Sequence, residues 1–290
     1  MNFILDILAE AAVDTLRLIP FLYLTYLLME YLEDKAQAQT VDLIRKTGRL
    51  GPLAGGLLGI IPQCGFSAAA SSLYAGGVIT VGTLFAIFLS TSDEMLPIFI
   101  SETVPAGTIV RILLGKAAIA VVMGFFLDFL NRLRHARRND TGERHIHDLC
   151  EQDNCHCEEG NIFLSALRHM LQIALFIFII SAAVGFLIEG IGSEALGRVL
   201  ADRAVAGVLL SALVGLIPNC AASVMITELY LKGILGVGQM MAGLLVGSGM
   251  GLLVLFRTHR NLKKNLQILG VLYVTGVFWG LLIELLEISF

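Results

Sequence analysis

The chain has few charged residues: Asp, Glu, Lys and Arg make up 15% of its 290 residues, whereas 56% are hydrophobic. A mean hydropathy of +0.80 is too apolar for a water-soluble domain of ordinary composition. The net charge is only -4 and the basic residues are scattered over short loops, so nothing suggests a nucleic-acid partner. The sequence therefore predicts an all-α integral membrane protein surrounded by membrane lipids.

Several familiar motifs are also missing. There is no G-x-x-x-x-G-K-[ST] phosphate loop, since Gly115-Lys116 lacks both the preceding glycine and the hydroxyl, and this disfavours an ATP-driven pump. The acids inside the apolar stretches have no histidine near them in sequence, so we expect no enzymatic activity. The N-terminus lacks the basic region and cleavage site of a secretory signal, and we expect it to be mature sequence.

Apolar stretches dominate what is present. A membrane-spanning helix needs roughly 20 mostly apolar residues. Stretches of that kind occur near 8–32, 81–100, 107–131, 162–189, 234–256 and 265–289. Two more, 51–79 and 206–233, are interrupted by glycines and by Pro62 or Pro218, and they predict broken helices or re-entrant hairpins. The chain should cross the membrane six to ten times.

The chain contains an internal repeat. A shift of 156 residues aligns 59–86 with 215–242 without a gap and gives 11 identities in 28 positions, Pro62 matching Pro218. The same shift pairs Asp128 with Glu284. We therefore expect a first transmembrane repeat over 1–133, a linker over 134–160 and a second transmembrane repeat over 161–290.

The charges of equivalent loops differ in sign. The loop after the first apolar stretch is basic in the first half and mixed at 189–204, whereas 101–103 is acidic and 257–264 is strongly basic. Because short basic loops stay in the cytoplasm, the halves should be inverted, with the linker 134–160 on the cytoplasmic face of the inner (plasma) membrane. Each half then has three spanning helices and one broken or re-entrant hairpin.

Inverted repeats with interrupted helices at corresponding places indicate a secondary transporter that works by alternating access. A broken helix exposes unsatisfied backbone groups, which a membrane tolerates only inside protein or beside a wet cavity. The side chains at the two breaks are therefore the first candidates for the transport path: Gln63, Cys64, Ser67, Asn219, Cys220 and Ser223. The alternative is that both prolines only kink packed helices around ordinary buried thiols.

A polar run, Ser90-Thr91-Ser92-Asp93-Glu94, lies inside the otherwise apolar helix at 81–100, and its last three residues are candidates for the path. Two adjacent carboxylates in a membrane should face a cavity, a cation or a basic partner. Lys116 could neutralise one of them, or act as a switching counter-ion during proton-coupled exchange. Glu228 is a further candidate for the path, although Lys232 four residues later suggests a simple intrahelical ion pair.

The linker is rich in histidine and cysteine, whose side chains suit a soft or borderline transition metal. Its candidate ligands are His145, His147, Cys150, Cys155, His156 and Cys157. Their spacing matches no closed structural zinc module, so we expect a flexible capture or sensing loop with reduced thiols, or else a plain polar linker.

Several segments together resemble the ten-transmembrane heavy-metal exporter family, whose members are described as arsenic efflux proteins or manganese transporters. They are Ile217–Ser223, Thr227–Tyr230, Gly251–Arg257, Thr91–Glu94, and Cys155–Cys157 before Ala166–His169. The resemblance covers most of the chain and implies efflux of a metal or metalloid.

Ligand chemistry narrows the substrate only in part. Carboxylate and amide oxygens outnumber sulfur in the apolar stretches and suit a hard divalent ion, which favours manganese, whereas Cys64 and Cys220 favour a soft metal or arsenite. Permeation of a small anion between helix N-termini is a second alternative. We expect no permanently bound cofactor, and proton coupling and a homo-oligomer stay open.

Overall fold

The computed structural model describes residues 50–61, 64–92, 95–137, 204–259 and 261–288, together with scattered helical residues between 8 and 27 and between 167 and 186. Within these ranges every regular element is an α-helix, as predicted. The helices of the first half are α3 (Gly51–Leu58), α4 (Cys64–Ala75), α5 (Val81–Ser90), α6 (Met95–Ser101) and α7 (Ala106–Arg137). Those of the second half are α11 (Ala204–Gly215), α12 (Cys220–Leu231), α13 (Val237–Val246), α14 (Gly251–Thr258) and α15 (Leu262–Leu285).

The helix boundaries recur at the sequence offset of the repeat. Helices α4 and α12 begin and end at equivalent residues, as do α5 and α13, while α7 and α15 begin at equivalent residues. Both α4 and α12 end in the same way. Gly77 and Gly233 have φ angles of 74° and 71°, a left-handed conformation that favours glycine, and the residue after each donates its N–H back to a leucine carbonyl at 2.9 Å.

A carboxylate from the last helix of each half supports the start of α5 and of α13. Asp128 accepts hydrogen bonds from the Gly82 N–H at 2.9 Å and from the Thr80 hydroxyl at 2.7 Å. Glu284, the equivalent residue, accepts one from the Gly238 N–H at 3.1 Å. Each carboxylate satisfies an N–H that has no partner within its helix and lies at the positive end of the helix dipole.

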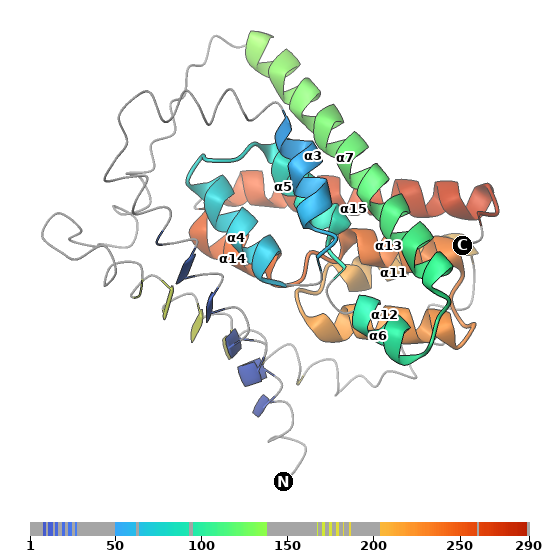
Figure 1. The fold of residues 1–290 in the computed structure, drawn as a ribbon. Helices are drawn as coiled ribbons and strands as arrows, with labels where there is room; N and C mark the ends of the chain where they lie inside the picture. Colours follow the sequence, from blue (N-terminus) through green and yellow to red (C-terminus); the bar gives the residue numbers. More distant parts are fainter. Residues whose placement is uncertain are drawn as a thin grey trace, which may run out of the picture.

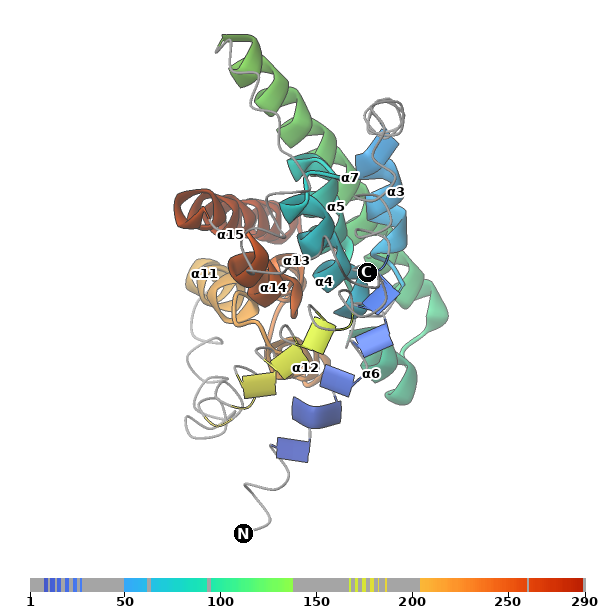
Figure 2. The same ribbon diagram turned by 90° about the vertical axis from the view of Figure 1, so that its left-hand side faces the viewer.

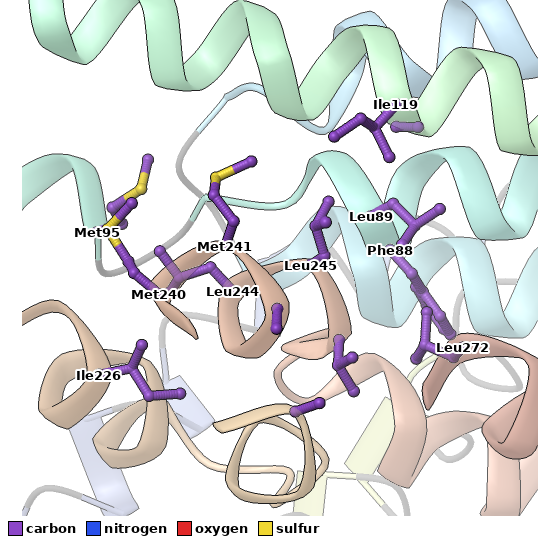
Figure 3. Close-up of a cluster of buried hydrophobic side chains, with 14 of the residues drawn as sticks. Phe88, Leu89, Met95, Ile119, Ile226, Met240, Met241, Leu244, Leu245 and Leu272 are labelled. Atoms are coloured by element: carbon purple, nitrogen blue, oxygen red, sulfur yellow. The ribbon is translucent and has the colours of Figure 1, made fainter. Parts of the chain in front are cut away.

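Helix α5 packs between α3 and α7, and α13 packs between α11 and α15. The halves also exchange contacts, because α4 lies along α14 and α6 lies along α12 (Figures 1 and 2). Side chains from these helices form one apolar core (Figure 3), which includes Phe88 and Leu89 of α5 and Met240, Met241 and Leu245 of α13. The two halves therefore share a core.

Helices α3 and α5 run in the same direction. A methyl group added at Gly55 would lie 3.1 Å from the Thr83 carbonyl, and one added at Gly59 would lie 2.9 Å from the Ile87 carbonyl. The chain therefore turns back after α3 and returns along α4 before α5 begins. The end of α3 reaches the same level as the end of α5, where Gly59 contacts Ser90.

Four stretches of the described chain are long and apolar enough to cross a membrane: Val81–Ser101, Ala106–Leu133, Val237–Thr258 and Leu262–Leu285. The breaks predicted near the two prolines are confirmed, since α3 ends at Leu58 before α4 begins at Cys64, and α11 ends before α12 begins at Cys220. The apolar runs predicted at 81–100 and 234–256 are confirmed as stretches of spanning length, but an interruption within each was not predicted. Each divides into two short helices, α5 and α6 or α13 and α14.

Some predictions fall on other parts of the chain. The first apolar stretch of each half, near 8–32 and 162–189, lies mostly outside the described residues. Met170 and Ala174, which are described and helical, pack against Ala68 of α4 and Met250 before α14. The linker 134–160 lies outside the described residues, apart from the end of α7, and the inverted orientation of the halves stays a prediction.

Candidate functional site

The candidate site lies where the two broken spans meet. Helix α5 ends at Ser90 and α6 begins at Met95, while α13 ends at Val246 and α14 begins at Gly251. Thr91 and Ser92 in the first gap are buried. The ends of α5 and α13 belong to different halves of the chain, yet one side chain connects them.

That side chain is Lys116, on α7, which is only 1% exposed. Its ammonium donates hydrogen bonds to the Thr91 carbonyl at 2.5 Å and to the Leu244 carbonyl at 3.0 Å. Thr91 directly follows α5, and Leu244 lies in the last turn of α13. The predicted partners of Lys116, Asp93 and Glu94, lie outside the described residues.

The two carbonyls suit an ammonium group because both lie at the C-terminal end of a helix. The last carbonyls of a helix have no intrahelical donor and carry the negative end of the helix dipole. In α13 the last such bond runs from the Gly247 N–H to the Gly243 carbonyl, which leaves the next carbonyl, that of Leu244, for Lys116. A cation buried here is stabilised by the ends of both helices.

Equivalent serines lie in the two gaps, since Ser92 and Ser248 are 156 positions apart. The Ser92 hydroxyl is 2% exposed and donates to the Ser90 carbonyl at 3.0 Å. The Ser248 hydroxyl is fully buried and has no hydrogen-bond partner among the described residues. Gly249, beside it, has a φ angle of 53°, which favours glycine. The second gap therefore presents a buried polar oxygen that the described fold does not use.

Two further predicted residues, Ser67 and Ser223, border the gap between α13 and α14. A methyl group added at Gly251 would lie 2.8 Å from the Ser67 Cβ, and one added at Gly247 would lie 3.4 Å from the Ser223 hydroxyl oxygen. The Ser71 hydroxyl donates to the Gly251 carbonyl at 2.6 Å, which connects α4 to α14. The structure thus brings Ser67 of the first half and Ser223 of the second half to the same gap.

The remaining predicted residues are less closely grouped. Cys64 and Cys220 are the first residues of α4 and α12, and Asn219 is buried just before α12. Gln63 and Pro62 lie outside the described residues, as does the His/Cys loop of the linker. Pro218 lies between α11 and α12 and is half-buried.

Glu228 is not part of this buried group. Its side chain is 50% exposed and accepts a hydrogen bond at 3.1 Å from Lys232, one helical turn later. The predicted intrahelical ion pair is therefore confirmed. Exposure of both partners makes it a weak interaction.

No group of three or more His, Cys, Asp or Glu side chains that could hold a metal occurs within the described ranges. The oxygens found at the gaps there are hydroxyls and main-chain carbonyls, which hard cations accept as ligands. Reasoning from sequence singled out the polar run that contains Thr91, and the repeat offset pairs Ser248 with Ser92, but neither Thr91 nor Ser248 was included among the candidate path residues. It missed Leu244, whose contribution is a main-chain carbonyl.

The chain was compared with known protein families, curated proteins and solved structures. No curated protein and no solved structure matches the chain. A family model described as "Putative, 10TM heavy-metal exporter" matches residues 4–194, which include α3 to α7. Since this is well over half of the chain, the protein belongs to that family of multi-pass membrane heavy-metal exporters.

Proposed function

We propose that the protein is a secondary-active transporter that exports a divalent transition-metal cation, with manganese as the first candidate. Transport would occur by alternating access between two inverted repeats, 1–133 and 161–290. The equivalent helix boundaries and the equivalent carboxylate contacts of Asp128 and Glu284 support the repeat. Breaks at corresponding places in both halves are the pattern from which secondary transporters build a site near the membrane midplane.

One observation carries the proposal: a single buried ammonium binds the ends of α5 and α13, one from each half. Backbone groups left unpaired inside a membrane are tolerated only where protein or a wet cavity meets them. Helix C-terminal ends and unwound carbonyls are the groups that coordinate cations in transporters built from discontinuous helices. The gaps at 91–94 and 247–250 are therefore the proposed path.

The chemistry of the path favours a hard divalent cation. The hydroxyls of Ser92 and Ser248 and the nearby carbonyls are oxygen donors, and we expect Asp93 and Glu94 to add carboxylates that offset the metal's charge. Arsenite or another soft metal is the competing candidate, because Cys64 and Cys220 begin the helices that follow the other two breaks. A small anion is disfavoured by the two acids.

The remaining parts of the proposal concern placement. We propose an inner-membrane protein whose linker 134–160 is cytoplasmic, with the His/Cys loop at 145–157 capturing or sensing metal before it enters the path. No enzymatic activity and no permanently bound cofactor are assigned to the chain.

The proposal is tested by measuring metal flux into or out of proteoliposomes that contain the purified protein, with Mn(II), Zn(II) and arsenite compared under the same gradients. We expect Mn(II) to move. Asp93→Asn and Glu94→Gln should reduce Mn(II) flux at least tenfold, because each removes one of the two charges proposed to offset the metal. Arsenite flux without Mn(II) flux would favour the soft-metal candidate. Movement of a different solute that neither acid variant affects would refute the cation proposal.

A further inference from the structure

We propose that Lys116 is a tethered cation that competes with the transported metal for the carbonyl oxygens of Thr91 and Leu244. This inference rests on the proposed function. It adds two main-chain ligands to the proposed path and a reason why the path stays closed when no metal is bound.

The geometry places a positive charge where a cation would bind. The Lys116 ammonium lies 2.5 Å from one carbonyl oxygen and 3.0 Å from the other, and the side chain is 1% exposed. Main-chain carbonyls are regular ligands of hard cations, and here each also lies at the negative end of a helix dipole. The same two oxygens can therefore hold an ammonium or a metal, but not both.

Helices α3 and α5 pack against α7, and α13 provides the Leu244 carbonyl that the ammonium contacts; these three helices contain no Asp, Glu, Lys, Arg or His. Along the chain, the acids nearest to the Thr91 carbonyl are Asp93 and Glu94, two and three positions later. A divalent ion bound to the Thr91 or Leu244 carbonyl would repel the ammonium, so Lys116 must leave the carbonyls when metal binds.

This exchange would also release a connection between the halves. Lys116 and Thr91 belong to the first half, whereas Leu244 belongs to the second. While the ammonium bridges them, α5 and α13 are held together at their ends, and Thr91, Ser92 and Ser248 in the gaps remain buried. Metal that displaces the ammonium removes this bridge, which couples metal binding to the rearrangement that alternating access requires.

If Lys116 competes with the metal, removing its charge should strengthen Mn(II) binding. If Lys116 has only a structural role, the same substitution should weaken Mn(II) binding or leave it unchanged. We would measure Mn(II) binding to the purified full-length protein in detergent, following the signal of free Mn(II) by electron paramagnetic resonance. Lys116→Gln and Lys116→Met remove the competing charge and should bind Mn(II) at least tenfold more tightly than the wild type. Lys116→Arg keeps the charge and adds donors, so it should bind Mn(II) several-fold more weakly.

Lys263→Gln is the matched control, because it removes a lysine charge from the exposed start of α15 and should leave the affinity unchanged. Equal or weaker binding by Lys116→Gln and Lys116→Met would overturn the inference. If neither variant yields monodisperse protein, the Mn(II) affinity of Lys116→Arg is the test. A wild-type affinity in Lys116→Arg would overturn the inference. Failure of the wild type to bind Mn(II) would count instead against the proposed function.

Discussion

Replacement of Gly251 by alanine would disturb the contact that joins the two halves beside the candidate site. Gly251 begins α14 and faces α4, where the Ser71 hydroxyl donates to its carbonyl. An added methyl group would lie 2.8 Å from the Ser67 Cβ, 2.9 Å from the Ser67 carbonyl and 2.8 Å from the Phe88 ring. All three distances are shorter than ordinary van der Waals contact.

The destabilisation by Gly251→Ala depends on how far the neighbouring atoms can move to make room for the methyl group. Two of the three atoms are fixed to the α4 backbone, and the Phe88 ring is fully buried. Overpacking of this kind costs about 1–3 kcal/mol, and the rigidity of the site places it near the upper end. Alanine recovers up to about 1 kcal/mol through its higher helix propensity. We therefore expect Gly251→Ala to lower the free energy of unfolding by about 2 kcal/mol.

The assay is reversible unfolding of the purified protein in mixed micelles of increasing SDS content, followed by circular dichroism. Gly107→Ala is the control, because Gly107 lies in the first turn of α7 and an added methyl group would meet nothing within 4 Å. The control should be neutral or slightly stabilising. Equal stability of Gly251→Ala and the wild type would refute the close approach of α4 and α14, and so would equal losses in both variants.

Three further predictions concern the rest of the molecule. Asp128→Ala leaves the Gly82 N–H without its acceptor and should lower the free energy of unfolding by about 2 kcal/mol in the same assay, whereas a change below about 0.5 kcal/mol would contradict the capping role. Deletion of 145–157 should change the apparent affinity or the regulation of Mn(II) flux and leave residual flux, and complete loss in correctly folded protein would place the loop in the path. A double-mutant cycle on Glu228 and Lys232 should give a coupling energy of at most about 0.5 kcal/mol, because both side chains are exposed, and a coupling above 1 kcal/mol would be inconsistent with that exposure.

The breaks beside Pro62 and Pro218 could be predicted because proline removes a backbone donor and clashes with the preceding turn. The described helices begin and end on either side of both positions, as that rule requires. The internal repeat could also be predicted from local sequence features. Residues that set helix ends, such as Gly77 and Gly233, keep the same spacing in both halves.

The breaks at 91–94 and 247–250 escaped prediction because neither contains proline and both lie inside apolar runs of membrane-spanning length. The polar residues near Ser92 and the glycines around Ser248 were the only local signals. A helix tolerates such residues when nothing competes for its backbone groups. Here Lys116 from another helix donates hydrogen bonds to the freed carbonyls, which is a contact between distant parts of the chain.

The packing of α4 on α14 and of α6 on α12 could not be predicted either. Hydrophobic runs show that a helix is apolar, but in a membrane both the lipid-facing and the protein-facing sides are apolar. The partner of each helix is instead set by close approach at small residues, such as Gly251 against Ser67. Shape complementarity of this kind depends on coordinates rather than on composition.

The central claim is that metal passes between the ends of α5 and α13. Anomalous diffraction at the manganese absorption edge, from crystals of the protein grown with Mn(II), would locate the bound ion directly. The account predicts an anomalous peak between the gaps at 91–94 and 247–250, within coordination distance of the Thr91 carbonyl and with Lys116 moved away from it. A peak confined to the 145–157 loop or to the protein surface, with Lys116 still bound to Thr91 and Leu244, would contradict it.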